Sequence, residues 1–265
     1  MSDWIVEVAN AYRWHRALGN EVVEGSHCQF IKDVEHPDVW SSNHITNVRA
    51  ASETEIRTLF AEMELELAHC SHRFVSADCF TPQQFLAYLS MSDYRELSPT
   101  LQMVLSGELE NVARSEADLR PVESEDDWES VYQMVRTDHE EGARTNRTIV
   151  SEAVSRGIVD GFKRKRGPST LYLASLDGEP CAYGMAVACP NGIGMVEDLY
   201  TLPSARNRGI ASEIIRHCVF GLRENGRGII FLGAHVGERP KYLYRKLGFV
   251  PLMVTREYVL EKIID

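Results

Sequence analysis

The segment from Met195 to Leu222 most constrains the fold, because it has the pattern of a buried strand, a tight polar turn and an amphipathic helix. Met195–Leu202 is the predicted strand, and Pro203 ends it because proline has no N–H to donate to a strand ladder. The helix is predicted to begin near Gly209. Its apolar side chains recur at helical spacing, at Ile210, Ile214, Ile215, Cys218, Val219 and Leu222. This order predicts an α/β fold.

The turn Arg206–Ala211 has the features of an anion site. Backbone amides that run into a helix N-terminus attract anions, because the first N–H groups lack internal partners and the helix dipole is positive there. Gly209 and Ala211 leave the backbone open to a ligand, and Arg206 and Arg208 add positive charge. The sequence therefore predicts a bound phosphate or pyrophosphate group.

Acidic residues are concentrated in the first part of the chain. Residues 1–118 contain 8 Lys and Arg against 19 Asp and Glu, and the whole chain has a net charge of −11, so residues 119–265 are balanced. This asymmetry predicts two domains, 1–118 and 119–265. An acidic domain disfavours a nucleic-acid partner and is compatible with a cationic substrate.

No apolar run approaches the roughly 20 residues that cross a bilayer, so we expect no membrane partner. The N-terminus has no basic leader, and the six cysteines contain no Cys-x-x-Cys pair. We therefore expect a cytoplasmic protein with reduced thiols. His69, His72 and Cys79 are poorly spaced for a tetrahedral metal site, and we expect no metal.

Residues 119–265 have the predicted order strand, helix, helix, three strands, helix, strand, helix, strand. This order resembles the GNAT superfamily of N-acetyltransferases. Two motifs carry the resemblance: Arg206-x-x-Gly209-x-Ala211 is similar to the family's Gln/Arg-x-x-Gly-x-Gly/Ala, and Tyr242–Phe249 is similar to its Leu-Tyr-x-Lys-x-Gly-Phe. The resemblance implies a GNAT (acyl-CoA N-acyltransferase) fold in this half, with a mixed sheet flanked by helices.

The resemblance also implies that acetyl-CoA is a co-substrate. It assigns coenzyme binding to the predicted strand and turn, at Leu199, Tyr200, Thr201, Arg206, Asn207, Arg208, Gly209, Ile210, Ala211 and Ser212. Two positions depart from the family: Gly237 replaces a frequent asparagine, and Pro240 replaces a small residue.

Amine acetylation requires a base for the amine, a donor that polarises the thioester carbonyl and an acid for the departing thiolate. The resemblance places Glu197 as the base, acting directly or through a water, and Tyr244 as the acid. It also assigns the carbonyl-polarising N–H to Leu199. The structural alternatives are that Glu197 pairs with an arginine or is exposed, and that Tyr244 packs in the core. His139, Glu140 and Glu141 are weaker candidates for binding a cation.

Segments of the first half resemble segments of the second half in the same order. His44–Ala50 resembles Met195–Thr201, Arg73–Ser76 resembles Ile230–Gly233, and Tyr94 corresponds to Phe249. The segment that corresponds to the phosphate turn has no glycine and no arginine pair, and Leu89 stands where Tyr244 stands in the second copy. We infer a degenerate GNAT-like domain without a coenzyme site; the alternative is that any α/β domain repeats this order.

Together these features predict an acetyl-CoA-dependent N-acetyltransferase that acetylates a primary amine of a small metabolite by direct attack. The alternatives are a protein lysine or N-terminal acetyltransferase, and a non-catalytic module that binds acyl-CoA. The chain is expected to be a monomer that forms its own pseudo-dimer, or a homodimer.

Overall fold

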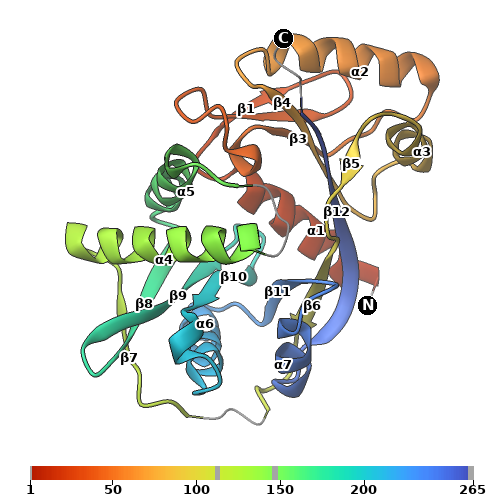
Figure 1. Cartoon of the computed structure of the whole chain (residues 1–265). Helices are drawn as coiled ribbons and strands as arrows, with labels where there is room; N and C mark the ends of the chain where they lie inside the picture. The colour runs from red at the N-terminus through yellow and green to blue at the C-terminus, as the bar shows by residue number, and fades with distance from the viewer. Residues whose placement is uncertain (1, 111–113, 145–148, 262–265) are drawn as a thin grey trace. The chain divides into compact units, whose positions relative to one another are not determined.

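The computed structural model describes residues 2–110, 114–144 and 149–261 (Figure 1). These residues form two compact units. The first contains the described residues up to 102, with 235–238 and 252–261, and the second contains those of 103–234 and 239–251. The division falls inside three strands, β6 (Thr100–Leu105), β11 (Ile229–His235) and β12 (Val250–Glu261). The domain boundary near residue 118 stays a prediction.

The first unit is a mixed sheet with helices. Its strands are β1 (Glu21–Glu24), β2 (Gln29–Lys32), β3 (His44–Thr46), β4 (His72–Ala77) and β5 (Arg95–Glu96), and its helices are α1 (Ser2–Ala17), η1 (Trp40–Ser42), α2 (Glu53–Glu66) and α3 (Gln83–Met91). The sheet order is β1-β2-β3-β4-β12, with β3 and β4 parallel and the other pairs antiparallel, and β5 also pairs with β12. The core under α2 includes Phe30, Leu59 and Phe85.

The second unit has the predicted element order up to its last strand, which is β12 and lies mostly in the first unit. It contains β7 (Asp118–Pro121), α4 (Glu125–Arg144), α5 (Glu152–Arg164), β8 (Ser169–Leu176), β9 (Glu179–Ala188), β10 (Ile193–Thr201), η2 (Pro203–Ala205), α6 (Ile210–Glu224), β11 (Ile229–His235) and α7 (Pro240–Lys246). Strands β7, β8, β9 and β10 are joined in that order by antiparallel pairing, and β10 and β11 are parallel. The helix predicted over 145–166 is α5, and residues 145–148 lie outside the described residues.

Helices cover both faces of this sheet. On β9, Gly184 faces α6 so closely that a Cβ there would lie 2.6 Å from Ile214 Cγ2. Its neighbour Tyr183 faces the opposite side, where its ring lies 6.1 Å from that of Phe162 on α5. The sheet is therefore packed between α6 on one face and α4 with α5 on the other (Figure 1).

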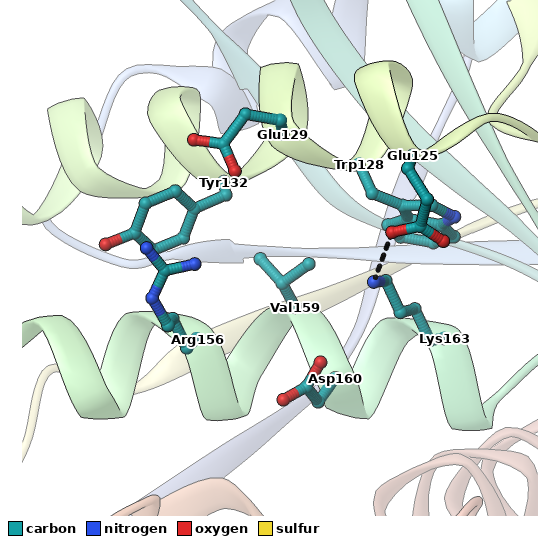
Figure 2. Close-up of a pocket in the computed structure, with 8 residues that line it drawn as sticks. All are labelled: Glu125, Trp128, Glu129, Tyr132, Arg156, Val159, Asp160 and Lys163. Atoms are coloured by element: carbon teal, nitrogen blue, oxygen red, sulfur yellow. Dashed lines mark hydrogen bonds and ion pairs between the residues drawn. The ribbon is translucent and has the colours of Figure 1, made fainter.

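Cations and aromatic rings hold α5 against α4. The Arg156 guanidinium lies 4.1 Å from the centre of the Tyr132 ring, and Lys163 Nζ lies 5.5 Å from that of Trp128 and 3.3 Å from the Glu125 carboxylate. Figure 2 shows these side chains around a groove of about 220 Å³ between the two helices. Arg156 and Lys163 of α5 thus pack against α4.

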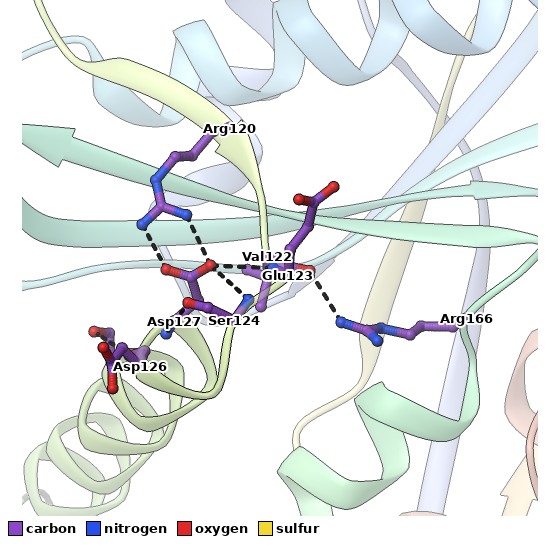
Figure 3. A network of polar contacts seen from close by, with 8 residues as sticks. Arg120, Val122, Glu123, Ser124, Asp126, Asp127 and Arg166 are labelled. Carbon is purple, nitrogen blue, oxygen red and sulfur yellow. Dashed lines mark hydrogen bonds and ion pairs between the residues drawn. The ribbon is translucent and has the colours of Figure 1, made fainter.

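Asp127 organises the start of α4. Its buried carboxylate accepts hydrogen bonds from both terminal nitrogens of Arg120 and from the amides of Glu123 and Ser124 (Figure 3). The Ser124 hydroxyl accepts the Asp127 amide in return, which makes a capping box. The Arg120 guanidinium, with these amides, holds the pKa of Asp127 well below its usual value. Strand β7 and helix α4 are therefore joined through one carboxylate.

None of the helices within residues 2–110, 114–144 and 149–261 combines the length and the hydropathy needed to cross a bilayer.

We predict that Asp127→Ala lowers the free energy of unfolding by about 2 kcal/mol, because it leaves two amides and a guanidinium without their acceptor. Asp126→Ala is the matched control: this adjacent carboxylate is exposed, and its loss should change stability by less than about 0.5 kcal/mol. Urea denaturation of both variants measures the difference. Equal destabilisation would show that the network adds nothing beyond the general effect of acidic residues at the helix start.

Candidate functional site

Strand β10 contains a β-bulge at its centre. Glu197 is opposite Met185 on β9, the next aligned pair is Tyr200 with Tyr183, and Asp198 between them has a left-handed φ of 53°. Because Met185 and Tyr183 point to the same face of β9, Glu197 and Tyr200 both face α4 and α5. Leu199 points the other way, toward α6, where its Cδ1 would lie 2.9 Å from a Cβ on residue 184. No glycine lies within Glu197–Thr201, so the sequence carries no glycine that would predict this bulge.

The parallel pairing of β10 with β11 stops where the bulge begins. It joins Ile193–Val196 to Ile229–Leu232, whereas β10 continues to Thr201. Among the described residues, Glu197–Thr201 therefore pair with β9 alone. The backbone of Leu199, Tyr200 and Thr201, which the resemblance assigns to coenzyme binding, lies in this part of the strand.

The turn after β10 directs its backbone toward the start of α6. Helix η2 binds the amides of Ala205 and Arg206 to the carbonyls of Leu202 and Pro203. Asn207 and Gly209 then adopt left-handed φ values of 63° and 78°, and α6 begins at Ile210 without a side-chain cap. Left-handed residues next to helical ones turn successive N–H groups to one side, which forms an anion-binding concavity. The predicted anion site thus has a suitable backbone.

Arg206 does not extend away from the protein. Its Nη1 and Nη2 donate to the two oxygens of Glu141 on α4 at 3.0 and 2.7 Å, and its Nε donates to the Thr201 carbonyl at 3.0 Å. The Tyr200 hydroxyl donates to the same Glu141 carboxylate at 2.8 Å. Burial and this hydrogen bond raise the pKa of Tyr200, and the Glu141 hydrogen bond raises the pKa of Arg206.

The remaining residues of the predicted coenzyme site differ in exposure. Arg208 is exposed, and no ion pair of Arg208 is found among the described residues. Gly209 and Ala211 are half-buried, whereas Ile210 and Ser212 are buried in the first turn of α6. Both arginines of the turn are exposed, and Arg206 differs from Arg208 in its ion pair with Glu141.

Tyr244 lies on α7 and is 6% exposed. Its ring centre is 6.4 Å from that of Phe249, and its carbonyl accepts the amides of Leu247 and Phe249. The chain turns back at Gly248, where φ is +94°. The predicted acid therefore has a fixed backbone and a largely buried ring.

The weaker candidates make other contacts. His139 Nδ1 lies 2.8 Å from the Ser155 hydroxyl on α5, and burial lowers the pKa of this histidine. Glu140 lies 3.8 Å from Arg136, one turn earlier on α4. Among the contacts found for these three residues in the described part of the chain, that of Glu141 with Arg206 reaches the turn 206–211. Sequence reasoning included Glu141 but gave no sign of its partner, which is distant in sequence.

Metal-ligand candidates in the first unit also have protein partners. His69 Nε2 lies 2.8 Å from the Asn43 amide oxygen, and His72 Nε2 lies 3.1 Å from the Asn43 carbonyl. Asp33, Glu35 and His36 bring three potential ligand atoms together. There the Asp33 carboxylate accepts the Glu35 amide and pairs with His36, which accounts for the arrangement as a polar turn.

The family comparison concerns the part of the second unit that begins just before β8. Residues 167–251 match the family model described as an acetyltransferase (GNAT) domain. This region is a GNAT domain. It contains β8 to α7, and with them the bulge, the turn and Tyr244. No curated protein sequence matches the chain.

Solved structures support the same fold over nearly the whole chain. A functionally unknown conserved protein from Staphylococcus epidermidis has a TM-score of 0.67 at 13% identity, over 92% of this chain and 95% of its own. A GCN5-related N-acetyltransferase from Kribbella flavida has a TM-score of 0.65 at 16% identity, over 96% and 95%. A tandem GNAT protein from the clavulanic acid biosynthesis pathway has 0.60 at 11%, over 91% and 81%. The predicted fold class, a GNAT fold preceded by a GNAT-like α/β unit, is confirmed.

We predict that Gly184→Ala destabilises the GNAT domain by about 1–3 kcal/mol, because the new methyl group would force Ile214 or Leu199 to move. Gly221→Ala on α6 is the matched control: its Cβ meets nothing within 4 Å, so stability should be unchanged or rise by up to about 1 kcal/mol. Thermal unfolding of both variants tests this. Similar midpoints for the two variants would contradict the close approach of α6 to β9.

Proposed function

We propose that this protein is an acetyl-CoA-dependent N-acetyltransferase that acetylates a primary amine of a small metabolite. The observation that carries the proposal is the continuous backbone of β10 and its turn, where β10 leaves β11 and then runs through left-handed Asn207 and Gly209 into α6. This backbone offers strand amides for an extended thiol-bearing arm and helix amides for phosphate groups. The GNAT match over residues 167–251 supports it.

The reaction is a direct transfer. The amine nitrogen attacks the thioester carbonyl carbon, the carbon–sulfur bond breaks, and the thiolate of coenzyme A leaves. Glu197 takes the proton from the amine, directly or through a water, and the Tyr244 hydroxyl gives a proton to the thiolate. The Leu199 amide stabilises the negative charge on the carbonyl oxygen.

We further propose that the coenzyme binds only to the second unit. The helix start that corresponds to α6 in the first unit is that of α2, where Glu55 Oε2 accepts the amides of Ala51 and Ser52 at 2.8 and 3.0 Å. The Ser52 hydroxyl accepts the Glu55 amide, which completes a capping box. The protein's own side chains thus occupy the groups that an anion would need, whereas α6 has no such cap.

The proposed function is tested by release of free thiol from acetyl-CoA with a panel of amines. Small aliphatic amines, polyamines, amino acids and peptides with a free N-terminus or lysine separate the acceptor classes. Turnover with the small amines is expected. Turnover with peptides alone would favour a protein acetyltransferase, and coenzyme binding without turnover of any amine would favour a binding module.

We expect Tyr244→Phe to lower kcat by roughly 10²–10⁴-fold, the contribution typical of a general acid, with little change in affinity for acetyl-CoA. The phenylalanine keeps the ring that packs near Phe249, so stability should change little. Tyr242→Phe is the control, because Tyr242 lies on the same helix and is 60% exposed. Unchanged kcat in Tyr244→Phe would remove Tyr244 from the chemistry.

We expect Glu197→Gln to lower kcat/KM most strongly near neutral pH. The loss should shrink as the pH rises toward the pKa of the amine acceptor, because a deprotonated amine needs no base. The pH profile of kcat/KM measures this. If Asp198→Asn gives that profile and Glu197→Gln does not, the base belongs to the bulge residue instead.

A further inference from the structure

We propose that Glu141 is a positioning residue for coenzyme binding, which acts by holding Arg206 and Tyr200 and so fixing the turn between β10 and α6. This inference rests on the proposed function, because it concerns the same coenzyme. It assigns the Arg206 side chain to contacts with other residues of the protein and leaves Arg208 to meet the phosphate groups.

The contacts of Arg206 use both edges of its guanidinium. The Nη edge makes a bidentate pair with the Glu141 carboxylate, and the Nε edge donates to the Thr201 carbonyl. Its central carbon lies 5.7 Å from the centre of the Tyr200 ring. A guanidinium has five N–H donors in a fixed plane. In Arg206, Nε, Nη1 and Nη2 each direct one of these donors at a protein acceptor. A phosphate bound by this side chain would have to share or displace Glu141.

The bond from Arg206 Nε to Thr201 closes the loop that contains η2. It links the end of β10 to the residue just before left-handed Asn207. The strand amides and the helix amides are therefore held at a fixed separation, and one coenzyme molecule must reach both sets at once. Positioning of this kind lowers the entropic cost of binding.

Arg206 also neutralises the negative charge of Glu141. Its side chain is 28% exposed and that of Arg206 is 44% exposed, so both charges lie at the edge of the site. A carboxylate there would repel a phosphate unless an opposite charge neutralised it. Arg206 provides this neutralisation. Loss of Arg206 alone therefore removes the link and also exposes a negative charge.

A charge swap separates the two roles of Arg206. If the link matters, Arg206→Glu and Glu141→Arg alone should each weaken acetyl-CoA binding by about tenfold or more, and the double variant should return to within about threefold of the parent. If Arg206 touches phosphate, the double variant should bind no better than Arg206→Glu. Binding is measured by calorimetry, after thermal unfolding has shown that each variant is folded.

A second pair of variants removes charges without reversing them, and it tests the proposal if the charge-swap variants do not fold. Arg206→Met should weaken binding more than the double variant Arg206→Met with Glu141→Gln, because the second change removes the uncompensated carboxylate. Equal weakening in the two would contradict the proposal. In the folded variants, KM for acetyl-CoA should rise while kcat at saturation is retained, since the chemistry lies elsewhere.

Salt dependence identifies the arginine that meets the phosphate groups. Arg208→Met should reduce the dependence of acetyl-CoA affinity on ionic strength, because a direct and exposed charge contact is screened by salt. The double variant Arg206→Met with Glu141→Gln should leave that dependence unchanged; the opposite result would overturn the assignment. If the parent protein does not bind acetyl-CoA at all, the proposed function fails, whereas binding by the parent without recovery in the swap removes only the role of Glu141.

Discussion

The end of the ladder between β10 and β11 is the constraint on which the candidate site depends. A strand buried in a sheet normally satisfies its backbone groups on both edges, and an unsatisfied group is costly. After Val196, the described part of β10 keeps only β9 as a partner. The bulge at Asp198 adds a left-handed residue without the freedom of glycine, at a cost of roughly 1–2 kcal/mol. A left-handed residue of this kind within a strand is typical of ligand sites.

The bulge also decides which side chains share a face. Without it, Glu197 and Tyr200 would point to opposite sides of the strand, because neighbours alternate and the two lie three residues apart. The extra residue brings both toward α4, where Tyr200 reaches Glu141. Helix α4 therefore has a capped first turn at Asp127 and, near its other end, a contact from Glu141 to Arg206 in the turn after β10. Helix α4 thus carries both the network that stabilises its own start and the carboxylate that holds Arg206 at the candidate site.

The sequence predicted the parts of the site that depend on local rules. Pro203, Gly209 and the helical spacing from Ile210 to Leu222 each act over a few residues, and the observed β10, turn and α6 follow them. The bulge was missed because Asp198 carries no local signal for positive φ. The pair of Glu141 with Arg206 was missed because it joins residues 65 positions apart. Strands β1 and β5 were also missed, since they are short and largely exposed.

The two helix starts, of α2 and α6, differ in how their first amides are filled, and the proposal that the coenzyme binds to the second unit alone rests on this difference. A helix N-terminus offers unpaired amides wherever it occurs, and what matters is whether the protein fills them. At α2, the side chains of Ser52 and Glu55 accept these amides. The hydrogen bonds from the backbone amides of Ala51 and Ser52 hold the pKa of Glu55 below its usual value. At α6, a left-handed glycine takes the cap position and provides no side chain. Under the proposed function, replacing a capping box by an uncapped glycine turn is a small change in sequence that converts a helix start filled by its own side chains into one that binds the phosphate groups of the coenzyme.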